Sequence, residues 1–263
     1  MNVDAASMIV NRRQGLGLAV AASTTALAGP GWAQQHPPEG FLEGEFLSRG
    51  EPMPVLLVPP TAEGPLTGAS IMMLHGSGGL GSDLPNFRAP AMRWASMGCA
   101  VVMPVYFSAA RDAPVSDPVA WWNRAVGDAA EWMLGLPGAD PDRLGAIGFS
   151  RGGYLAAEVA VRESRLKAVV GVASAGNVKP EDIVRQPEVL LIHASADPVV
   201  SPLRTRHWAR VLRDRGVPVE VSTLSSPRHN FNRTEWPRIF AEAETFFLRT
   251  LAAPAAAPSV PPL

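Results

Sequence analysis

One short stretch of the chain combines a serine with the glycine spacing of a catalytic turn. The pattern G-x-S-x-G is matched by residues 148–152, GFSRG, in which a sharp turn between a strand and a helix would expose the hydroxyl of Ser150. Neighbours without a Cβ leave room for such a strained turn. Apolar residues 144–149 before it and helical spacing over 154–160 after it make an ordinary strand–turn–helix joint the weaker interpretation. We therefore predict a nucleophile at Ser150, with the amide of Arg151 free at the helix start to face a developing oxyanion.

A serine hydroxyl becomes a useful nucleophile only beside a base that a carboxylate orients. Ligand sites of α/β sheets lie beyond the carboxyl ends of the strands, so the base should come from a loop that follows a strand. We predict His229 as the base, because it lies in a loop after the last expected strand. The other four histidines lie in an expected linker (His36), within a helix (His207), at the end of an apolar strand (His193) and at the start of a Gly-rich loop (His75).

The orienting acid is expected on a second loop of the same kind. Asp197 directly follows the buried strand expected over residues 189–193, although an aspartate before a proline is also common in simple turns. Asp140 and Asp142 precede the strand that leads to the serine, so they belong to the opposite edge of the sheet. Asp182, in an irregular connection, is the reserve candidate. We predict Asp197 as the acid of a serine triad.

A second oxyanion donor is expected from the glycine-rich residues 75–79, HGSGG, which follow a strand expected over residues 70–74. Glycines let a backbone approach a substrate oxygen closely, and their N–H groups can point at it. We favour the amide of Ser77, with those of Gly76 and Gly78 as alternatives. A phosphate-binding loop is the other interpretation, but the lysine and the glycine spacing of that motif are missing.

Alternating strands and helices must position these loops. Strands are expected over residues 40–47, 53–58, 70–74, 99–103, 144–149, 166–172, 189–193 and 217–224, and helices over 85–97, 119–134, 154–160, 203–215 and 235–251. A turn is expected at Glu51-Pro52, between the first two strands. The strands are continuous apolar runs, which suits a parallel sheet covered on both faces. We predict one α/β domain over residues 41–251, with a doubly wound, mostly parallel sheet and helices on both faces.

Four stretches together resemble the dienelactone hydrolase family of the α/β-hydrolase superfamily, namely residues 75–79, 142–153, 196–200 and 229–231. The resemblance implies the α/β-hydrolase fold, a Ser-Asp-His triad in this chain order, and no cofactor. One departure matters, because family members that open dienelactones have cysteine at the elbow, where this chain has Ser150. Serine versions of this branch resemble carboxylesterases and related acyl hydrolases.

The expected function is therefore that of a serine hydrolase that cleaves carboxylic esters of small or medium size through an acyl-enzyme. A serine peptidase or amidase and a lactone hydrolase stay open as alternatives, since one triad serves all of them. Tyr106 and Phe107, after the strand expected over residues 99–103, are candidates for an apolar substrate pocket, although aromatic side chains are more often core residues. Arg111 and Arg228 are candidates for contact with a substrate carboxylate, for which solvation is the simpler role.

Composition limits the partners of this chain. Its 263 residues include 23 Lys+Arg and 24 Asp+Glu, and this balance argues against nucleic acid as a partner. The single cysteine, Cys99, excludes an intramolecular disulfide and a thiolate metal cluster, and its apolar neighbours indicate a core residue. No metal site is predicted, and the expected partner is a small-molecule ester.

The N-terminal region differs in character from the rest of the chain. Arg12 and Arg13 precede a weakly apolar stretch over residues 16–28, and small residues then lead to Ala33. This pattern resembles a twin-arginine signal peptide over residues 1–33, and a disordered extension is the alternative. The apolar stretch is too short and too rich in alanine to span a membrane.

Two further segments flank the predicted domain. Residues 34–40 are expected to be a linker, and residues 252–263, rich in alanine and proline, a disordered tail. Cleavage of a twin-arginine signal would make the mature protein periplasmic or secreted.

Overall fold

The structure, a computed structural model, describes residues 6–7, 21–22, 37–110, 117–162 and 164–252. The expected signal peptide lies outside these residues except for β1 (Ala6–Ser7) and β2 (Ala21–Ala22), which form a short antiparallel pair. Arg111 and the expected tail beyond residue 252 also lie outside them. Within the described residues, no helix combines the length and the apolar character that crossing a membrane requires.

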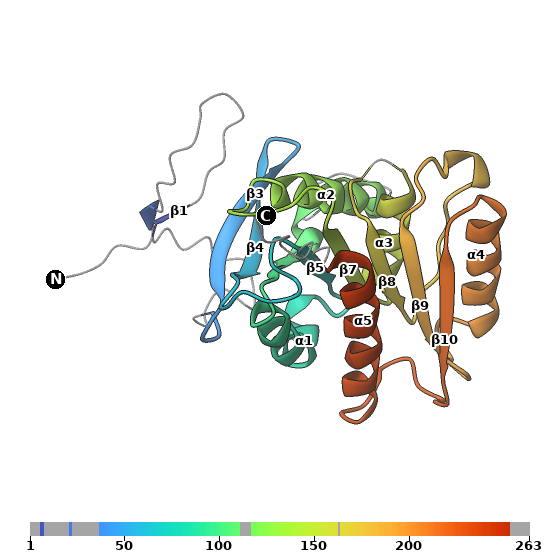
Figure 1. Cartoon of the computed structure of the whole chain (residues 1–263). Coiled ribbons are helices and arrows are strands. Elements are labelled where there is room, and N and C mark those ends of the chain that lie inside the picture. Colours follow the sequence, from blue (N-terminus) through green and yellow to red (C-terminus); the bar gives the residue numbers. More distant parts are fainter. Residues whose placement is uncertain (1–5, 8–20, 23–36, 111–116, 163, 253–263) are drawn as a thin grey trace, which may run out of the picture.

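Eight strands form one sheet in the order β10-β9-β8-β7-β5-β6-β4-β3 (Figure 1). Their bounds are β3 (Leu42–Ser48), β4 (Glu51–Val58), β5 (Ser70–Leu74), β6 (Ala100–Pro104), β7 (Leu144–Phe149), β8 (Ala168–Val172), β9 (Glu188–Ala194) and β10 (Val219–Leu224). Strand β4 is antiparallel to both β3 and β6, and the other neighbouring strands are parallel. Strands β5 to β8 are buried at every position, because helices cover both faces of a sheet of this kind. The predicted mostly parallel sheet is confirmed.

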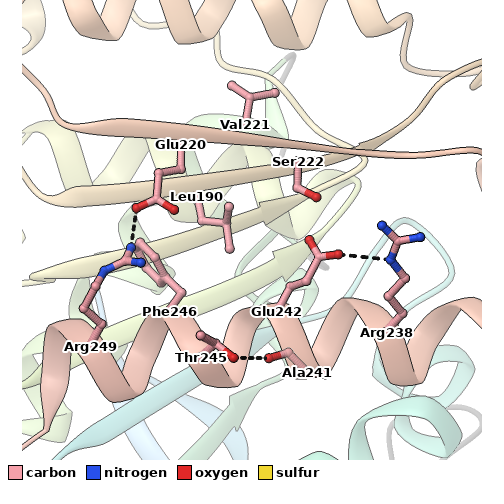
Figure 2. A pocket seen from close by; sticks show the side chains of 10 residues that line it. All are labelled: Leu190, Glu220, Val221, Ser222, Arg238, Ala241, Glu242, Thr245, Phe246 and Arg249. Atoms are coloured by element: carbon pink, nitrogen blue, oxygen red, sulfur yellow. Dashed lines mark hydrogen bonds and ion pairs between the residues drawn. The ribbon is translucent and has the colours of Figure 1, made fainter.

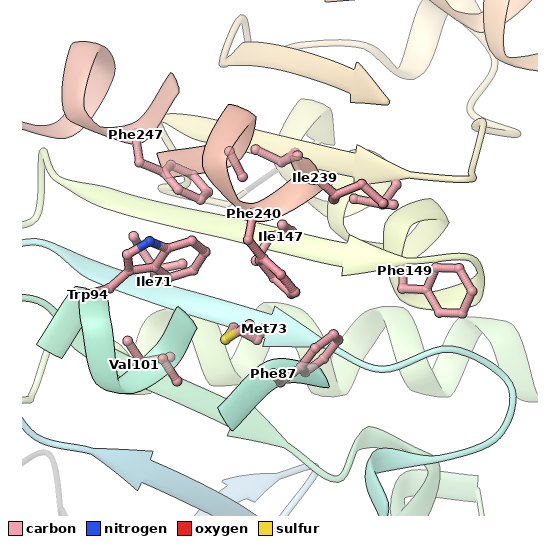
Figure 3. Packing of buried hydrophobic residues seen from close by; sticks show 14 of the residues in the cluster. Ile71, Met73, Phe87, Trp94, Val101, Ile147, Phe149, Ile239, Phe240 and Phe247 are labelled. Carbon is pink, nitrogen blue, oxygen red and sulfur yellow. The ribbon is translucent and has the colours of Figure 1, made fainter. Parts of the chain in front are cut away.

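The helices form one layer on each face of the sheet. Their bounds are α1 (Leu80–Ala95), α2 (Pro118–Met133), α3 (Arg151–Arg162), α4 (Pro202–Asp214) and α5 (Glu235–Leu251), with short 3₁₀ helices η1 (Tyr106–Ala110) and η2 (Pro180–Asp182). Helices α1 and α5 cover Ile71 and Met73 of β5, and Phe240 of α5 packs into this core (Figure 3). The alternate residues Met72 and Leu74 point to the other face, where α2 and α3 pack. Helix α4 shares an apolar cluster with α3 and β9.

The β3–β4 hairpin turns at Arg49 and Gly50, so the turn predicted at Glu51-Pro52 is wrong. Both turn residues have positive φ, 56° and 86°, as a two-residue turn of the I′ type requires. Glu51 and Pro52 instead begin β4. Glycine adopts positive φ without strain, so Gly50 is the better turn signal than the proline.

Helix α1 begins at Leu80 rather than at the predicted Pro85. Proline is common in the first turn of a helix, which is why Pro85 suggests a start there, but Pro85 and Pro90 both lie inside the helix. The added turn places Asp83 beside the glycine-rich loop that precedes the helix. Most other predicted bounds agree with the structure within two residues.

Candidate active site

Ser150 lies on the tight turn between β7 and α3. Its φ is 49°, in the left-handed region that residues with a Cβ rarely adopt. The neighbouring glycines are needed for space. A Cβ on Gly148 would lie 2.2 Å from the carbonyl carbon of Gly152, and a Cβ on Gly152 would lie 2.3 Å from the carbonyl oxygen of Leu74. The turn therefore has the strained, glycine-flanked geometry that the sequence predicts.

Three side chains from distant parts of the chain meet at this turn. Nε2 of His229 lies 2.9 Å from Oγ of Ser150, and Nδ1 of His229 lies 2.8 Å from Oδ2 of Asp197. The Asp197 side chain is fully buried, and that of His229 is 10% exposed. Because a carboxylate only accepts hydrogen bonds, Nδ1 carries a proton and Nε2 is left to accept from the Ser150 hydroxyl. The structure thus brings together the three residues predicted as a triad.

The loop after β9 fixes the orientation of the Asp197 carboxylate. Its second oxygen, Oδ1, accepts the backbone amides of Val199 at 2.8 Å and Val200 at 2.9 Å. Both carboxylate oxygens are therefore engaged, one by the loop and one by His229. Ser150, Asp197 and His229 follow β7, β9 and β10, three parallel strands whose carboxyl ends share one edge of the sheet.

The His229 loop is tied to the start of α5 by a reciprocal pair of hydrogen bonds. Oδ1 of Asn232 accepts the amide of Glu235 at 3.0 Å, and Oε2 of Glu235 accepts the amide of Asn232 at 2.7 Å. Arg228 also lies 3.8 Å from Glu235, in an ion pair. The ring of Phe149 lies 5.3 Å from the His229 ring and supports it. Asn232 and Glu235 were not among the predicted site residues, although an N-x-x-E spacing before an apolar helix is the signal for this kind of cap.

The alternative bases and acids lie elsewhere. His193 is a buried core residue, as predicted: its Nδ1–H donates to a backbone carbonyl at 3.1 Å, and its Nε2 accepts from Thr223 Oγ1 at 2.9 Å. Burial lowers the pKa of His193, so it is neutral at pH 7. Asp142 precedes β7 at the opposite edge of the sheet, and Asp182 is exposed in η2, 4.0 Å from Arg162. The structure therefore brings neither aspartate to Ser150.

The glycine-rich loop, residues 75–79, lies against the serine turn. The amide of Gly76 donates to Oδ2 of Asp83 at 2.6 Å, so Gly76 is corrected from an alternative oxyanion donor to a fixed part of the loop. The amides of Ser77 and Gly78 have no acceptor among the described residues. Asp83 is buried, and this burial raises the pKa of its carboxyl. Asp83 was not among the predicted site residues, because its role depends on a helix start that Pro85 and Pro90 conceal in the sequence.

The side chains of His75 and Tyr106 stabilise this loop by ring stacking and by hydrogen bonds to its backbone. The two rings stack with centroids 4.1 Å apart, and the Tyr106 hydroxyl donates to the His75 carbonyl at 2.5 Å. Nδ1 of His75 lies 2.9 Å from the Gly76 carbonyl, which only accepts, so Nδ1 carries the proton. Burial lowers the pKa of His75 to about 4, which leaves the imidazole neutral at pH 7. Tyr106 is fully buried and supports the loop, so its prediction as a pocket-lining residue is wrong.

Phe107 is half-buried in an aromatic cluster next to the loop. Its ring centroid lies 4.7 Å from that of His75 and 4.6 Å from that of Trp122. The guanidinium of Arg151, the residue after Ser150, lies 5.8 Å from the centroid of the Trp122 ring. Phe107 stays a prediction as a substrate contact, and Trp122 is a neighbour that the sequence analysis did not assign to the site.

The described residues contain no group of three or more His, Cys, Asp or Glu side chains that could hold a metal ion. Cys99 is fully buried, as predicted, and burial raises the pKa of its thiol. A neutral thiol of this kind is neither a nucleophile nor a metal ligand. The reactive groups that the site offers are therefore the hydroxyl of Ser150, the imidazole of His229 and the free backbone amides.

Residues 54–250 match the sequence model of the dienelactone hydrolase family. A search of curated protein sequences gave no significant match.

Solved structures with the same fold include several hydrolases. A thermophilic esterase from Thermogutta terrifontis, solved with propionate bound, is 18% identical; the match covers 83% of this chain and 97% of that chain, with a TM-score of 0.65. A Xanthomonas campestris protein described as an α/β serine hydrolase without lid is 20% identical, with 82% and 98% covered and a TM-score of 0.64. An acylaminoacyl peptidase from Pyrococcus horikoshii is 16% identical, with 82% and 42% covered and a TM-score of 0.61. These likenesses show the α/β-hydrolase fold.

Proposed function

The chain belongs to the dienelactone hydrolase family, and we propose that within this family of hydrolases it is a serine esterase that cleaves small or medium carboxylic esters through an acyl-enzyme. One observation carries the proposal. Nε2 of His229 is 2.9 Å from the Ser150 hydroxyl, and Nδ1 is 2.8 Å from the Asp197 carboxylate. This is the arrangement that makes a serine hydroxyl nucleophilic.

In the first half of the proposed reaction, Oγ of Ser150 attacks the acyl carbonyl while Nε2 of His229 takes the hydroxyl proton. Asp197 holds the imidazole tautomer and stabilises the imidazolium that forms. The carbonyl oxygen becomes an oxyanion, for which the amides of Arg151 and Ser77 are the proposed donors. Arg151 is the first residue of α3, where helix amides lack intrahelical partners, and Ser77 has no acceptor among the described residues.

In the second half, the tetrahedral intermediate collapses and its bond to the alcohol oxygen breaks. The proton held at Nε2 of His229 passes to the leaving alcohol, and the acyl group stays on Ser150 as an ester. A water molecule then gives its proton to His229 and attacks the acyl-enzyme. Collapse of the second intermediate returns the proton to Oγ and releases the carboxylic acid.

An open site supports the choice of small or medium esters. The connection between β8 and β9 contains only η2, a helix of three residues, and no larger insertion covers the serine turn among the described residues. The Xanthomonas protein with this fold is likewise described as lacking a lid, and the Thermogutta esterase binds propionate, a short acid. Serine rather than cysteine at position 150 separates the chain from the relatives that open dienelactones.

Labelling tests the nucleophile directly. A fluorophosphonate probe should modify the full-length protein at Ser150, as located by mass mapping, and Ser150→Ala should abolish the label. Strong labelling of the Ser150→Ala protein would remove the proposed mechanism.

A second measurement separates esterase from peptidase activity. The acylaminoacyl peptidase among the structural neighbours has the same fold, so the fold does not decide between the two. The protein should hydrolyse p-nitrophenyl acetate much faster than a peptide p-nitroanilide. Activity on the anilide alone would reverse the order of the two proposals.

We also propose export after cleavage of the N-terminal segment. The paired arginines at positions 12 and 13, followed by a weakly apolar stretch, support a twin-arginine signal. N-terminal sequencing of the exported protein should begin near Gln34, and replacement of both arginines by lysine should retain the protein in the cytoplasm. An intact Met1 on an extracytoplasmic protein would contradict cleavage.

A further inference from the structure

Two surface grooves in the described part of the chain differ in how their charged side chains are used. The first, of about 410 Å³, lies between β10 and α5 (Figure 2). In it, Arg238 pairs with Glu242 at 3.1 Å, and Arg249 pairs with Glu220 across the groove. Each arginine has an acidic partner within the groove itself, so this groove offers no unbalanced charge to a ligand.

The second groove, called the α4 groove, lies between residues 175–180 and one face of α4, which contributes Leu203, Arg204, His207, Trp208 and Val211. Its volume is about 620 Å³. Binding sites for small molecules typically occupy a few hundred to about 1,000 Å³ and combine apolar walls with few polar groups. The α4 groove has this size and this mixture of side chains.

The charge that lines the α4 groove has one sign. Lys179 and Arg204 are the charged side chains that line it, and no acidic side chain does. Neither Lys179 nor Arg204 has an ion-pair partner among the described residues, and Arg204 only donates a long hydrogen bond, 3.4 Å, to Oδ1 of Asn177. The buried carboxylate of Glu158 faces the protein side of this rim, where it accepts the amide of Asn177 at 3.0 Å. The groove therefore favours an anion.

The floor and the rim of the groove provide apolar surface. Trp208 is 2% exposed, and its Nε1–H has no acceptor among the described residues. The indole packs so closely on Gly176 that a Cβ there would lie 2.4 Å from the ring. Leu203, at the rim, is 72% exposed. The contact surface that the groove offers to a ligand beside its charges is therefore apolar.

We propose that the α4 groove is a second binding site, which takes a small organic anion. The acidic group of the ligand contacts Arg204 and Lys179, and its apolar body contacts Leu203 and the floor formed by Trp208. The site is separate from the catalytic centre, but both sites contact helix α3. The Arg204 guanidinium lies 5.8 Å from the ring of Tyr154, a residue of α3 whose amide donates to the Ser150 carbonyl.

The test uses the full-length protein with 2-naphthoate as the probe and isothermal titration calorimetry as the readout. Arg204→Gln and Lys179→Gln should each raise the Kd about tenfold, because each removes one charge-assisted contact. Arg210→Gln is the matched control, since it removes a cation from α4 that does not line the groove. Its Kd should stay within about twofold of the wild-type value.

Two further comparisons make the result decisive. The neutral analogue 2-naphthamide should bind about tenfold more weakly than 2-naphthoate, because it lacks the charge that the groove attracts. Leu203→Ala, which removes exposed apolar surface from the rim of the groove, should weaken binding about threefold. The proposal fails if 2-naphthoate does not bind up to about 5 mM, if naphthamide binds equally well, or if both glutamine variants keep the wild-type Kd.

Discussion

The carboxylate of Asp197 divides its two oxygens between the imidazole of His229 and the backbone of its own loop. Oδ2 lies 2.8 Å from Nδ1 of His229, while Oδ1 accepts the amides of Val199 and Val200. One side chain thus fixes both the loop after β9 and the tautomer of the imidazole in the loop after β10.

Asp197→Asn separates these two roles. The asparagine oxygen can keep the amides of Val199 and Val200, so the fold should be preserved. Its NH₂ group would face Nδ1 and force the proton onto Nε2, where it can no longer accept from Ser150. The kcat for p-nitrophenyl acetate should fall by about 10⁴-fold, measured by steady-state kinetics.

Asp182→Asn is the control for this change, because Asp182 is the exposed reserve candidate in η2. Its kcat should stay within about twofold of the wild-type value. If Asp197→Asn retained more than about a tenth of the wild-type kcat, Asp197 would not be the orienting acid.

Gly152 packs where no side chain fits. A Cβ there would lie 2.3 Å from the Leu74 carbonyl oxygen and 2.6 Å from that of His75, both backbone atoms that cannot easily move. Gly152→Ala should therefore lower the free energy of unfolding by more than about 3 kcal/mol, measured by urea denaturation.

Gly81→Ala should have the opposite sign. A Cβ on Gly81, in the first turn of α1, would meet nothing within 4 Å. Alanine is the better helix former, so the free energy of unfolding should rise by about 0.5–1 kcal/mol. Equal effects of the two substitutions on the free energy of unfolding would show that the close backbone contacts around Gly152 do not exclude a side chain from the turn.

The meeting of Ser150, Asp197 and His229 could be predicted from sequence because it depends on local patterns and chain order. The glycines around Ser150 and the apolar runs before Ser150, Asp197 and His229 mark strands that end at loops. Parallel strands then bring those loops to one edge of the sheet, whatever the details of packing. The fold class follows from the same alternation of strands and helices.

The supporting residues could not be predicted in this way, because their roles come from tertiary contacts. Asp83 reaches Gly76 only because α1 begins one turn before Pro85. Tyr106 follows a strand, as a pocket residue would, but its ring stacks on His75 and is buried. Neither contact leaves a periodic signal in the sequence.

Asp83 should act on catalysis by positioning the glycine-rich loop. It accepts the Gly76 amide at 2.6 Å, next to the Ser77 amide proposed for the oxyanion. Asp83→Ala should lower kcat about 10- to 100-fold with little change in KM, less than the loss of an oxyanion donor itself would cost. Asp83→Asn keeps an accepting oxygen and should recover most of this kcat.

Kinetics and thermal unfolding of the same variants distinguish positioning from a general loss of stability. Asp142→Ala, on the opposite edge of the sheet and in an exposed ion pair with Lys167, should leave kcat unchanged. An Asp83→Ala enzyme that melts earlier but keeps its kcat would show that Asp83 only stabilises the fold.

His75 should make the folded state sensitive to acid. Its pKa is lowered to about 4 by burial, against 6.5 for an exposed imidazole. Between these values the unfolded chain binds a proton that the folded chain does not, so stability falls as the pH drops from 6.5 toward 4. This one group should cost about 2 kcal/mol of unfolding free energy by pH 5, and about 3 kcal/mol by pH 4.

Urea denaturation between pH 7 and pH 4.5 measures this effect. The quantity to compare between wild type and a His75 variant is the slope of the unfolding free energy against pH. His75→Asn should be less stable at pH 7, because it loses the stacking on Tyr106, but its free energy of unfolding should fall less steeply as the pH is lowered. His207→Asn, which removes an exposed histidine of α4, should follow the wild-type curve, since carboxylates and His193 titrate alike in both proteins. Parallel curves of unfolding free energy against pH for wild type and His75→Asn would contradict this prediction. They would mean that the His75 imidazole binds its proton as readily in the folded chain as in the unfolded chain.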